Sequence, residues 1–290
     1  MDAFRKVIAG VAVGIGASLA AGAACAIDNS AIGMPGFREH VATYGLVYRL
    51  PRDVTDVLDA RINGPVKDRL LKLGLVAESR QFNLPHVTVV HIHSADPSTP
   101  AKMLRALPKV PPVVNLTLKG FYTTEAAKGA GAPWWLDLGI VKTGQGFEDM
   151  MAYNTVATAA LAPLRDGPLP RCTGPVYAVM SDLARELTRT VGVSGVNVVK
   201  DGKEVRSHNP HNTLVYSMTK FDPALQAAMN QLADELNKAL PDGIATSFRD
   251  ISIVEIGFMG NVLREFYRIS LETGQAWDVA SGNAVPFPAR

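Results

Sequence analysis

Two segments of this 290-residue chain share one pattern, in which a proline and a histidine are followed by a variable residue, a threonine and an aliphatic residue. The composition of each segment predicts a β-strand, and side chains alternate between the two faces of a strand. The histidine and the threonine of each segment therefore share a face. A fold that joins the two strands would gather two imidazoles and two hydroxyls at one place. The segments, 125 positions apart, are Pro85-His86-Val87-Thr88-Val89 and Pro210-His211-Asn212-Thr213-Leu214.

Two histidines beside two threonines suit the cleavage of a phosphodiester. A histidine titrates near neutral pH, so one ring can accept a proton from the attacking oxygen while another donates one to the leaving oxygen. Hydroxyl donors stabilise the negative charge that builds on the phosphoryl oxygens. The candidate catalytic residues are therefore His86 and His211, and the candidate phosphate-binding residues are Thr88 and Thr213. This set needs neither a metal nor another cofactor, so none is expected.

The order of the predicted elements indicates an α+β fold. Adjacent strand pairs imply antiparallel ladders rather than a doubly wound sheet. Neither a Walker-type phosphate loop nor a dinucleotide fingerprint is present in the sequence. The expected strands cover residues 44–50, 84–92, 113–122, 134–142, 211–218, 251–258 and 264–271. The expected helices cover residues 53–62, 66–73, 98–107, 147–164, 176–190 and 222–236.

Local signals place several boundaries of these elements. Asp53 is expected to cap the first helix, and Gly64-Pro65 to separate it from the second. Asp222 is expected to cap the helix that begins with Pro223. Gly260-Asn261 predicts a hairpin between the last two of these strands.

The N-terminus has the three-part order of a secretory signal peptide. A short basic region is followed by an apolar run and by Ala24-Cys25-Ala26, a small-residue cleavage site. Residues 1–26 are therefore expected to be removed, which predicts a periplasmic or secreted protein with no stable membrane span. A retained anchor is disfavoured because the apolar run is short, and lipid attachment at Cys25 because the usual preceding leucine is missing. Cleavage leaves Cys172 as the single cysteine, so no internal disulfide can form.

The two motifs resemble those of the two-histidine (2H) phosphoesterase superfamily, which includes 2′–5′ RNA ligase-like proteins and cyclic phosphodiesterases. The resemblance covers residues 44–271 and rests on both His-x-Thr-aliphatic segments. It implies one bilobal domain over residues 27–290, with pseudo-symmetric lobes, mainly antiparallel sheets and outer helices around a central cleft. The long spacing between the motifs places an insertion around residues 165–209. One histidine would act as base and the other as acid, in an order that the resemblance leaves open.

The expected function is that of an exported, metal-independent phosphodiesterase acting on a small substrate of the 2′,3′-cyclic nucleotide type. A formal net charge of +2 favours a small ligand over a long nucleic-acid duplex, which usually needs a strongly basic face. RNA ends are a second candidate partner. Two alternatives remain open, namely a non-enzymatic protein of the same fold that binds a phosphorylated ligand or an RNA end, and a zinc-dependent hydrolase. The sequence carries no signal for an oligomeric state.

The zinc alternative depends on the other histidines near the motifs. If the first motif strand is regular, His91 and His93 face away from His86, and His208 is offset from His211. No carboxylate or cysteine stands at ligand spacing beside them, which favours acid–base chemistry. Some aromatic and basic residues could contact a base or a phosphate but are expected as ordinary core or surface residues. They are Phe82, Tyr122, Trp134, Trp135, Lys142, Arg171 and Arg206.

Overall fold

The computed structural model describes residues 42–75, 79–81, 84–125, 134–165, 198–200, 203–205, 208–217, 219–257 and 260–287. The expected signal peptide, Cys172, the expected helix at 176–190 and most of the expected insertion lie outside the described residues. The helices are α2 (Arg52–Arg61), α3 (Asn63–Lys72), α4 (Thr99–Ala106), α5 (Gln145–Leu161) and α8 (Pro223–Ala239), with a 3-10 turn at Ala162–Leu164. Within the described residues, no helix is long and apolar enough to cross a membrane.

The strands form two larger sheets and a small hairpin, all antiparallel in their pairing. Sheet A has the order β13-β12-β11-β10-β1-β3, and sheet B has the order β2-β8-β5-β4-β9. The strands are β1 (Ala42–Arg49), β2 (Ser79–Gln81), β3 (His86–Ser94), β4 (Val114–Glu125), β5 (Trp134–Ile140), β6 (Val198–Lys200), β7 (Lys203–Val205), β8 (His211–Ser217), β9 (Ile244–Phe248), β10 (Asp250–Ile256), β11 (Val262–Ser270), β12 (Ala276–Asp278) and β13 (Ala284–Val285). The predicted α+β class with antiparallel sheets is confirmed.

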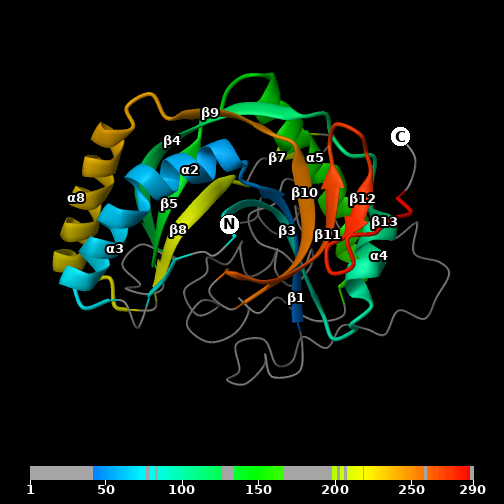
Figure 1. Ribbon diagram of the computed structural model, residues 1–290, viewed down its shortest axis with the longest axis horizontal. Helices are drawn as coiled ribbons and strands as arrows, with labels where there is room; N and C mark the ends of the chain where they lie inside the picture. Colours follow the sequence, from blue (N-terminus) through cyan, green and yellow to red (C-terminus); the bar gives the residue numbers. More distant parts are fainter. Residues whose placement is uncertain are drawn as a thin grey trace, which may run out of the picture.

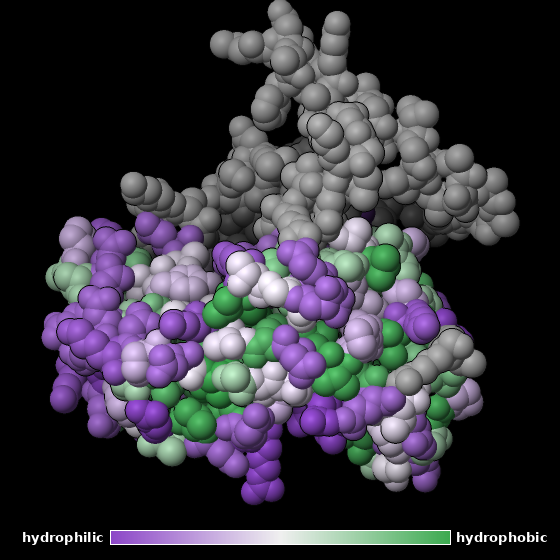
Figure 2. Space-filling model, turned by 90° about the horizontal axis from the view of Figure 1, so that it is seen from above, coloured by the Kyte–Doolittle hydropathy of each residue, from purple (hydrophilic) through white to green (hydrophobic). Residues whose placement is uncertain are grey.

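Helices cover the outside of both sheets (Figure 1). Helices α3 and α8 lie beside sheet B, while α4 and α5 lie beside sheet A. Tyr48 of β1 meets Tyr153 of α5 edge-on at 6.5 Å between ring centroids, which marks the helix-covered face of sheet A. Trp134 of β5 stacks on Phe221, just before α8, on the corresponding face of sheet B. Seen from above, polar side chains dominate the end of the molecule that carries α8 (Figure 2).

Two of the predicted helix boundaries are wrong, and a third is confirmed. Helix α2 begins after Pro51, and Asp53 lies inside its first turn, where it accepts a hydrogen bond from the Thr246 hydroxyl at 3.1 Å. Gly64-Pro65 lies in the first turn of α3, because proline is tolerated there and its missing N–H breaks no helical bond. Asp222 does cap α8, with its Oδ1 accepting from the Leu225 amide at 2.9 Å.

One strand is longer than the sequence predicted, and others were not predicted. β4 extends to Glu125 rather than ending at residue 122. β9 was not predicted, and it follows α8 directly through Gly243, whose φ of 71° suits a residue without a side chain. β10 and β11 form the expected hairpin around Gly260-Asn261. The tail, where no element was predicted, adds β12 and β13 to the edge of sheet A.

Candidate active site

The two sequence motifs lie on adjoining strands that belong to different sheets. β3 is the edge strand of sheet A and contacts β8 of sheet B. The Asn212 side chain joins them, since its Oδ1 accepts a hydrogen bond of 3.1 Å from the backbone N–H of His86. Asn212 is the variable residue of the second motif and is buried. The fold therefore brings His86 and His211 to the same junction between the sheets.

Each motif histidine is held by the same local hydrogen bond. Nδ1 of His86 lies 2.8 Å from the Leu84 carbonyl oxygen, and Nδ1 of His211 lies 2.6 Å from that of Asn209. A carbonyl can only accept, so Nδ1 carries the proton in both rings. Nε2 is then the nitrogen at which each ring gains or loses a proton. A proline stands between each histidine and the residue whose carbonyl its ring contacts. The proline ring fixes the φ angle of that intervening residue, which explains why both motifs begin with proline.

Both motif strands also contain a β-bulge at the same position. In the pairing of β3 with β1, Val89 is the extra residue, because Thr88 pairs with Val47 and Val90 pairs with Leu46. In the pairing of β8 with β5, Leu214 is the extra residue. Each is the third residue after its histidine. A bulge of this kind switches the alternation of side chains downstream of it.

The bulge at Val89 overturns the expectation for the neighbouring histidines. On β1, Gly45 lies opposite His91 and Thr43 lies opposite His93. Both are an even number of residues from Arg49, which lies opposite His86, so their side chains share one face of β1. His91 and His93 therefore lie on the same face as His86, not on the opposite one. The prediction assumed a regular strand and was wrong for that reason. Within the described residues, no group of three or more His, Cys, Asp and Glu side chains is placed to hold a metal ion.

We call the face of each sheet that carries its histidine and threonine the motif face. It is the face opposite the helices, since the core residues Val87 and Val90 of β3 point the other way. On sheet B a row runs across three strands, in which Tyr122 pairs with Asp137 and Asp137 pairs with Thr213. Gly139 lies opposite His211. A Cβ there would come within 3.1 Å of the Tyr122 ring, so glycine lets that ring approach the strand.

Asp137 is the acidic residue beside the second motif. Its Oδ1 lies 3.8 Å from Nε2 of His211, and its side chain is 3% exposed against 37% for the imidazole. Burial, together with the negative charge of Asp137, raises the pKa of Tyr122 to about 12. The Tyr122 hydroxyl also accepts a hydrogen bond of 3.3 Å from Asn209 Nδ2. Asn209 thus links the tyrosine to the ring of His211 through its own carbonyl.

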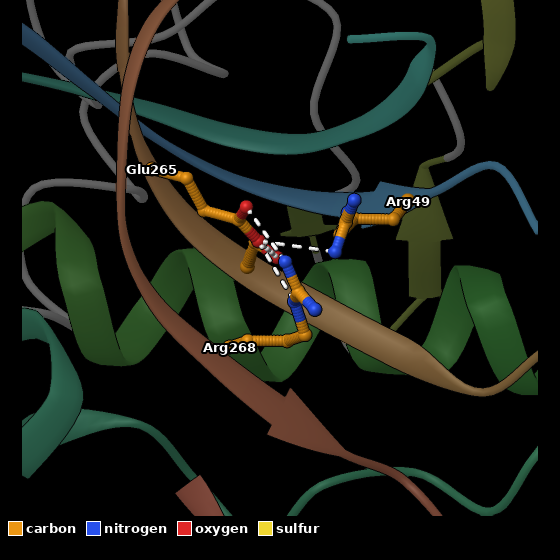
Figure 3. Close-up of polar contacts among 4 residues, drawn as sticks. Arg49, Glu265 and Arg268 are labelled. Atoms are coloured by element: carbon orange, nitrogen blue, oxygen red, sulfur yellow. Dashed lines mark hydrogen bonds and ion pairs between the residues drawn. The ribbon is translucent and has the colours of Figure 1, made fainter. Parts of the chain in front are cut away.

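The motif face of sheet A carries charged groups of both signs (Figure 3). Arg49, which pairs with His86 across the strands, points to the Glu265 carboxylate at 3.5 Å. Arg268 approaches the same carboxylate with two nitrogens, at 3.2 and 3.0 Å. Burial alone would raise the pKa of Glu265, but hydrogen bonds from Arg268 and Ser252 and the nearby guanidinium charges bring it below its usual value. Burial lowers the pKa of Arg49.

The remaining sequence candidates are spread over the structure. Trp134 is fully buried in the core, Trp135 is half-buried on the motif face of sheet B, and Lys142 is exposed. Phe82, Arg171 and Arg206 lie outside the described residues. An open hollow of about 620 Å³ is lined by residues of α2, β4 and β9 and includes neither motif.

Three residues of this site were not predicted from the sequence, namely Arg49, Asp137 and Asn212. Asn212 stood inside the second motif as a variable position, and its amide was not recognised as a group that could join two strands. Arg49 and Asp137 are brought to the histidines by strand pairing across the sheets. Their positions 37 and 74 residues away in the sequence carry no local signal of that pairing. Tyr122 was considered as a stacking residue, not for its hydroxyl.

No protein-family model and no curated protein matches this sequence. Among solved structures, a conserved protein of unknown function from Agrobacterium tumefaciens matches with 13% identity and a TM-score of 0.40, covering 77% of this chain and 83% of its own. E. coli LigT complexed with NADP⁺ matches with 10% identity and a TM-score of 0.37, covering 80% and 98%. Kluyveromyces marxianus Usb1 with uridine monophosphate matches with 12% identity and a TM-score of 0.35, covering 78% and 97%.

Membership of the two-histidine phosphoesterase superfamily stays a prediction from the two motifs, because LigT and Usb1 match this chain with TM-scores of only 0.37 and 0.35. The sequence identities are 10% and 12%, and the likeness is one of chain arrangement. The chemistry of this chain is therefore derived from its own residues.

Replacing Asn212 by leucine tests the junction between the sheets. The change keeps a branched side chain, although a larger one, and removes the acceptor for the His86 amide, which leaves a buried donor unsatisfied at a cost of about 1–3 kcal/mol. Because His86 then loses its tether to β8, we expect any turnover that depends on the His86 ring to fall by about 10- to 100-fold. Denaturant unfolding and steady-state kinetics measure the two effects.

Asn154→Leu is the matched control. Asn154 is also buried, and its Nδ2 donates at 2.6 Å to the β3 carbonyl of Val89, a residue that follows the histidine and threonine of the first motif. We expect this variant to lose stability with little loss of kcat under conditions where it stays folded. Equal losses of kcat in the two variants would mean that Asn212 acts only on stability.

Proposed function

We propose that this chain is an exported phosphodiesterase that hydrolyses a small cyclic phosphodiester of the 2′,3′-cyclic nucleotide type. The observation that carries the proposal is the junction of β3 and β8, where two His-x-Thr strands adjoin and both imidazoles are held through Nδ1. This arrangement leaves two Nε2 atoms for proton transfer. Two proton-transfer groups are what the cleavage of a phosphodiester by water requires.

In the proposed reaction, one histidine takes a proton from water as the water oxygen attacks phosphorus. The other histidine donates its proton to the ribose oxygen as the bond from phosphorus to that oxygen breaks. The product is a nucleoside monophosphate. The hydroxyls of Thr88 and Thr213, which are half-buried on the two motif faces, donate to the non-bridging oxygens. Because these donors are fixed before reaction, they stabilise the charge of the transition state without reorganising.

A small substrate is favoured by the chemistry around the motifs. The charged cluster on sheet A contains two arginines and the carboxylates of Asp250 and Glu265, so it adds no net positive charge. A long duplex would need an extended basic surface for its phosphates. A mononucleotide, or the end of an RNA strand, needs only one phosphate site and room for one base.

Export is proposed from the N-terminal sequence alone. The basic region, apolar run and small-residue site predict cleavage after Ala26. The mass of the protein recovered from a periplasmic or secreted fraction would then correspond to a chain that begins at Ile27. A protein recovered with residues 1–26 still attached would contradict cleavage without bearing on the catalytic proposal.

The proposed activity is tested by assaying the purified protein on 2′,3′-cyclic UMP, 3′,5′-cyclic UMP and a linear dinucleotide. We expect hydrolysis of the 2′,3′-cyclic substrate that is unchanged by EDTA, because the two histidines supply both proton transfers. Loss of activity with EDTA and its return with Zn²⁺ would support a zinc-dependent hydrolase instead. Binding of these nucleotides without turnover would identify a binding protein.

A further inference from the structure

We propose that Arg49 is a further phosphate-binding residue of the candidate active site, whose guanidinium contacts a non-bridging oxygen of the phosphate bound beside His86. The inference rests on the proposed function and deepens it, because it adds a permanent positive charge to the imidazoles and hydroxyls of the two motifs. Arg49 belongs to neither motif. A phosphodiester is an anion, and the planar guanidinium of arginine matches the geometry of phosphate oxygens.

Arg49 stands directly beside the first motif histidine. It is the residue of β1 that pairs with His86 of β3, and the side chains of such a pair share a face, with Cβ atoms about 4.5–5.5 Å apart. On sheet B, the residue paired with His211 is Gly139, which has no side chain. Of the two residues paired with the motif histidines, Arg49 is therefore the one that can offer a charge to a ligand.

The guanidinium of Arg49 has hydrogen bonds to spare. Its Nη1 lies 3.5 Å from the Glu265 carboxylate, which is longer than a charge-assisted hydrogen bond, and the side chain is 25% exposed. The guanidinium donates no hydrogen bond to any residue that the structure describes, and its Nε is buried without an acceptor. Another of its nitrogens is turned away from Glu265 (Figure 3). Donors left over in this way are rare in proteins, and a bound anion is one reason for them.

Glu265 anchors Arg49 without using its donors. The carboxylate accepts hydrogen bonds of 3.2 and 3.0 Å from Arg268 and one of 2.7 Å from the Ser252 hydroxyl. These bonds fix the carboxylate, so the ion pair holds one end of the Arg49 guanidinium while its other nitrogens stay available. A long side chain that is oriented before the ligand arrives loses less conformational entropy on binding.

The charges around Arg49 also favour an added anion. Burial lowers the pKa of Arg49, and Glu265 and Asp250, opposed by the charge of Arg268, do not restore it. The guanidinium still stays protonated at neutral pH. The cluster is neutral as a whole, but Arg49 lies on β1, next to β3, while the other three residues lie on β10 and β11. A phosphate beside the first motif would therefore meet the positive end of this cluster.

Uridine 3′-monophosphate tests the contact without turnover. We expect Arg49→Met, which keeps a long unbranched side chain, to weaken its binding about 10- to 100-fold in isothermal titration calorimetry, as the loss of a hydrogen bond between charged groups predicts. Binding of uridine, which lacks the phosphate, should be unaffected. Arg49→Lys should recover part of the affinity, because it restores the charge without the planar fork. Unchanged binding of the monophosphate by Arg49→Met would overturn the inference.

Arg69→Met is the matched control. Arg69 is also partly buried, at 19% exposed, and pairs with the Glu235 carboxylate at 3.0 Å, but it lies on α3, on the side of sheet B opposite its motif face. This variant removes the same charge and should change the affinity for the monophosphate by no more than about two-fold, since distant charges are screened. Equal losses in the two variants would point to net charge and would overturn the inference. Circular dichroism checks the folding, and Arg49→Gln replaces Arg49→Met if the latter does not fold.

Hydrolysis assays separate this inference from the proposed function. In Arg49→Met, kcat/KM on 2′,3′-cyclic UMP should fall at least as far as the affinity for the monophosphate. If the parent protein hydrolysed no phosphodiester but the variant still bound the monophosphate more weakly, the proposed function would fail while the phosphate contact stood. If the parent hydrolysed the substrate and the variant bound and hydrolysed equally well, the inference alone would fail. A parent protein that bound neither the monophosphate nor inorganic phosphate, followed by ³¹P NMR, would also overturn the inference.

Discussion

Alanine at either His86 or His211 is expected to lower kcat on a 2′,3′-cyclic nucleotide by about 10²–10⁴-fold. Each variant removes one of the two proton transfers that the reaction needs, at an imidazole held through Nδ1. The double variant should lose little more than the worse single variant, because residues that act as a unit are not additive. Initial rates under saturating substrate measure these losses.

His91→Ala is the matched control for that result. His91 lies on the same strand and the same face as His86, but it is outside the motif. We expect its kcat to stay within a few-fold of the parent value, with circular dichroism and thermal unfolding showing that all variants are folded. A loss as large as that of His86→Ala would contradict the two-histidine mechanism and would favour a metal site built from several histidines.

The largest effect on stability is expected for Trp134→Ala. Trp134 is fully buried on the helix-covered face of sheet B and stacks on Phe221 at 4.9 Å between ring centroids. Removing its side chain takes away a large buried apolar surface and leaves a cavity, so the free energy of unfolding should fall by about 3–5 kcal/mol. Equilibrium unfolding in urea, followed by circular dichroism, measures the change.

Trp277→Ala is the comparison for this variant. Trp277 is half-buried on the short strand β12, near the edge of sheet A. Its replacement should cost clearly less than that of Trp134, because part of its surface is already in water and a surface site leaves no closed cavity. Equal losses in the two variants would mean that the Trp134 site relaxes around the missing ring.

The fold class could be predicted from the sequence because its signals are local. Alternating apolar residues marked strands such as β10 and β11, and Asp222 with Pro223 marked the start of α8. The boundaries predicted at Asp53 and at Gly64-Pro65 were wrong, because these residues are as compatible with the first turn of a helix as with its boundary. β9 is only five residues long, and its mixed composition gave no alternation strong enough to detect.

The candidate site could be predicted only in part, for a physical reason. The motifs identified His86 and His211, because a pattern that occurs twice can be recognised from the sequence alone. The charges around them arise from which strands pair, and pairing between Asp137 and Thr213 depends on the whole of sheet B. The face of β3 on which His91 and His93 lie depends on a single bulge that no local sequence signal predicted. Long-range register, rather than composition, decides both points.

The two bulges have a consequence for how this chain can change by insertion and deletion. Residues before each motif lie in connections that can lengthen without altering which side chains the motif strand displays. Immediately after each threonine, the loss of one residue at Val89 or Leu214 would restore simple alternation. The residues that follow, such as His93, would keep their pairing partners on β1 and the faces that they now occupy. Each bulge therefore marks a position at which a motif strand can lose one residue without exchanging its two faces.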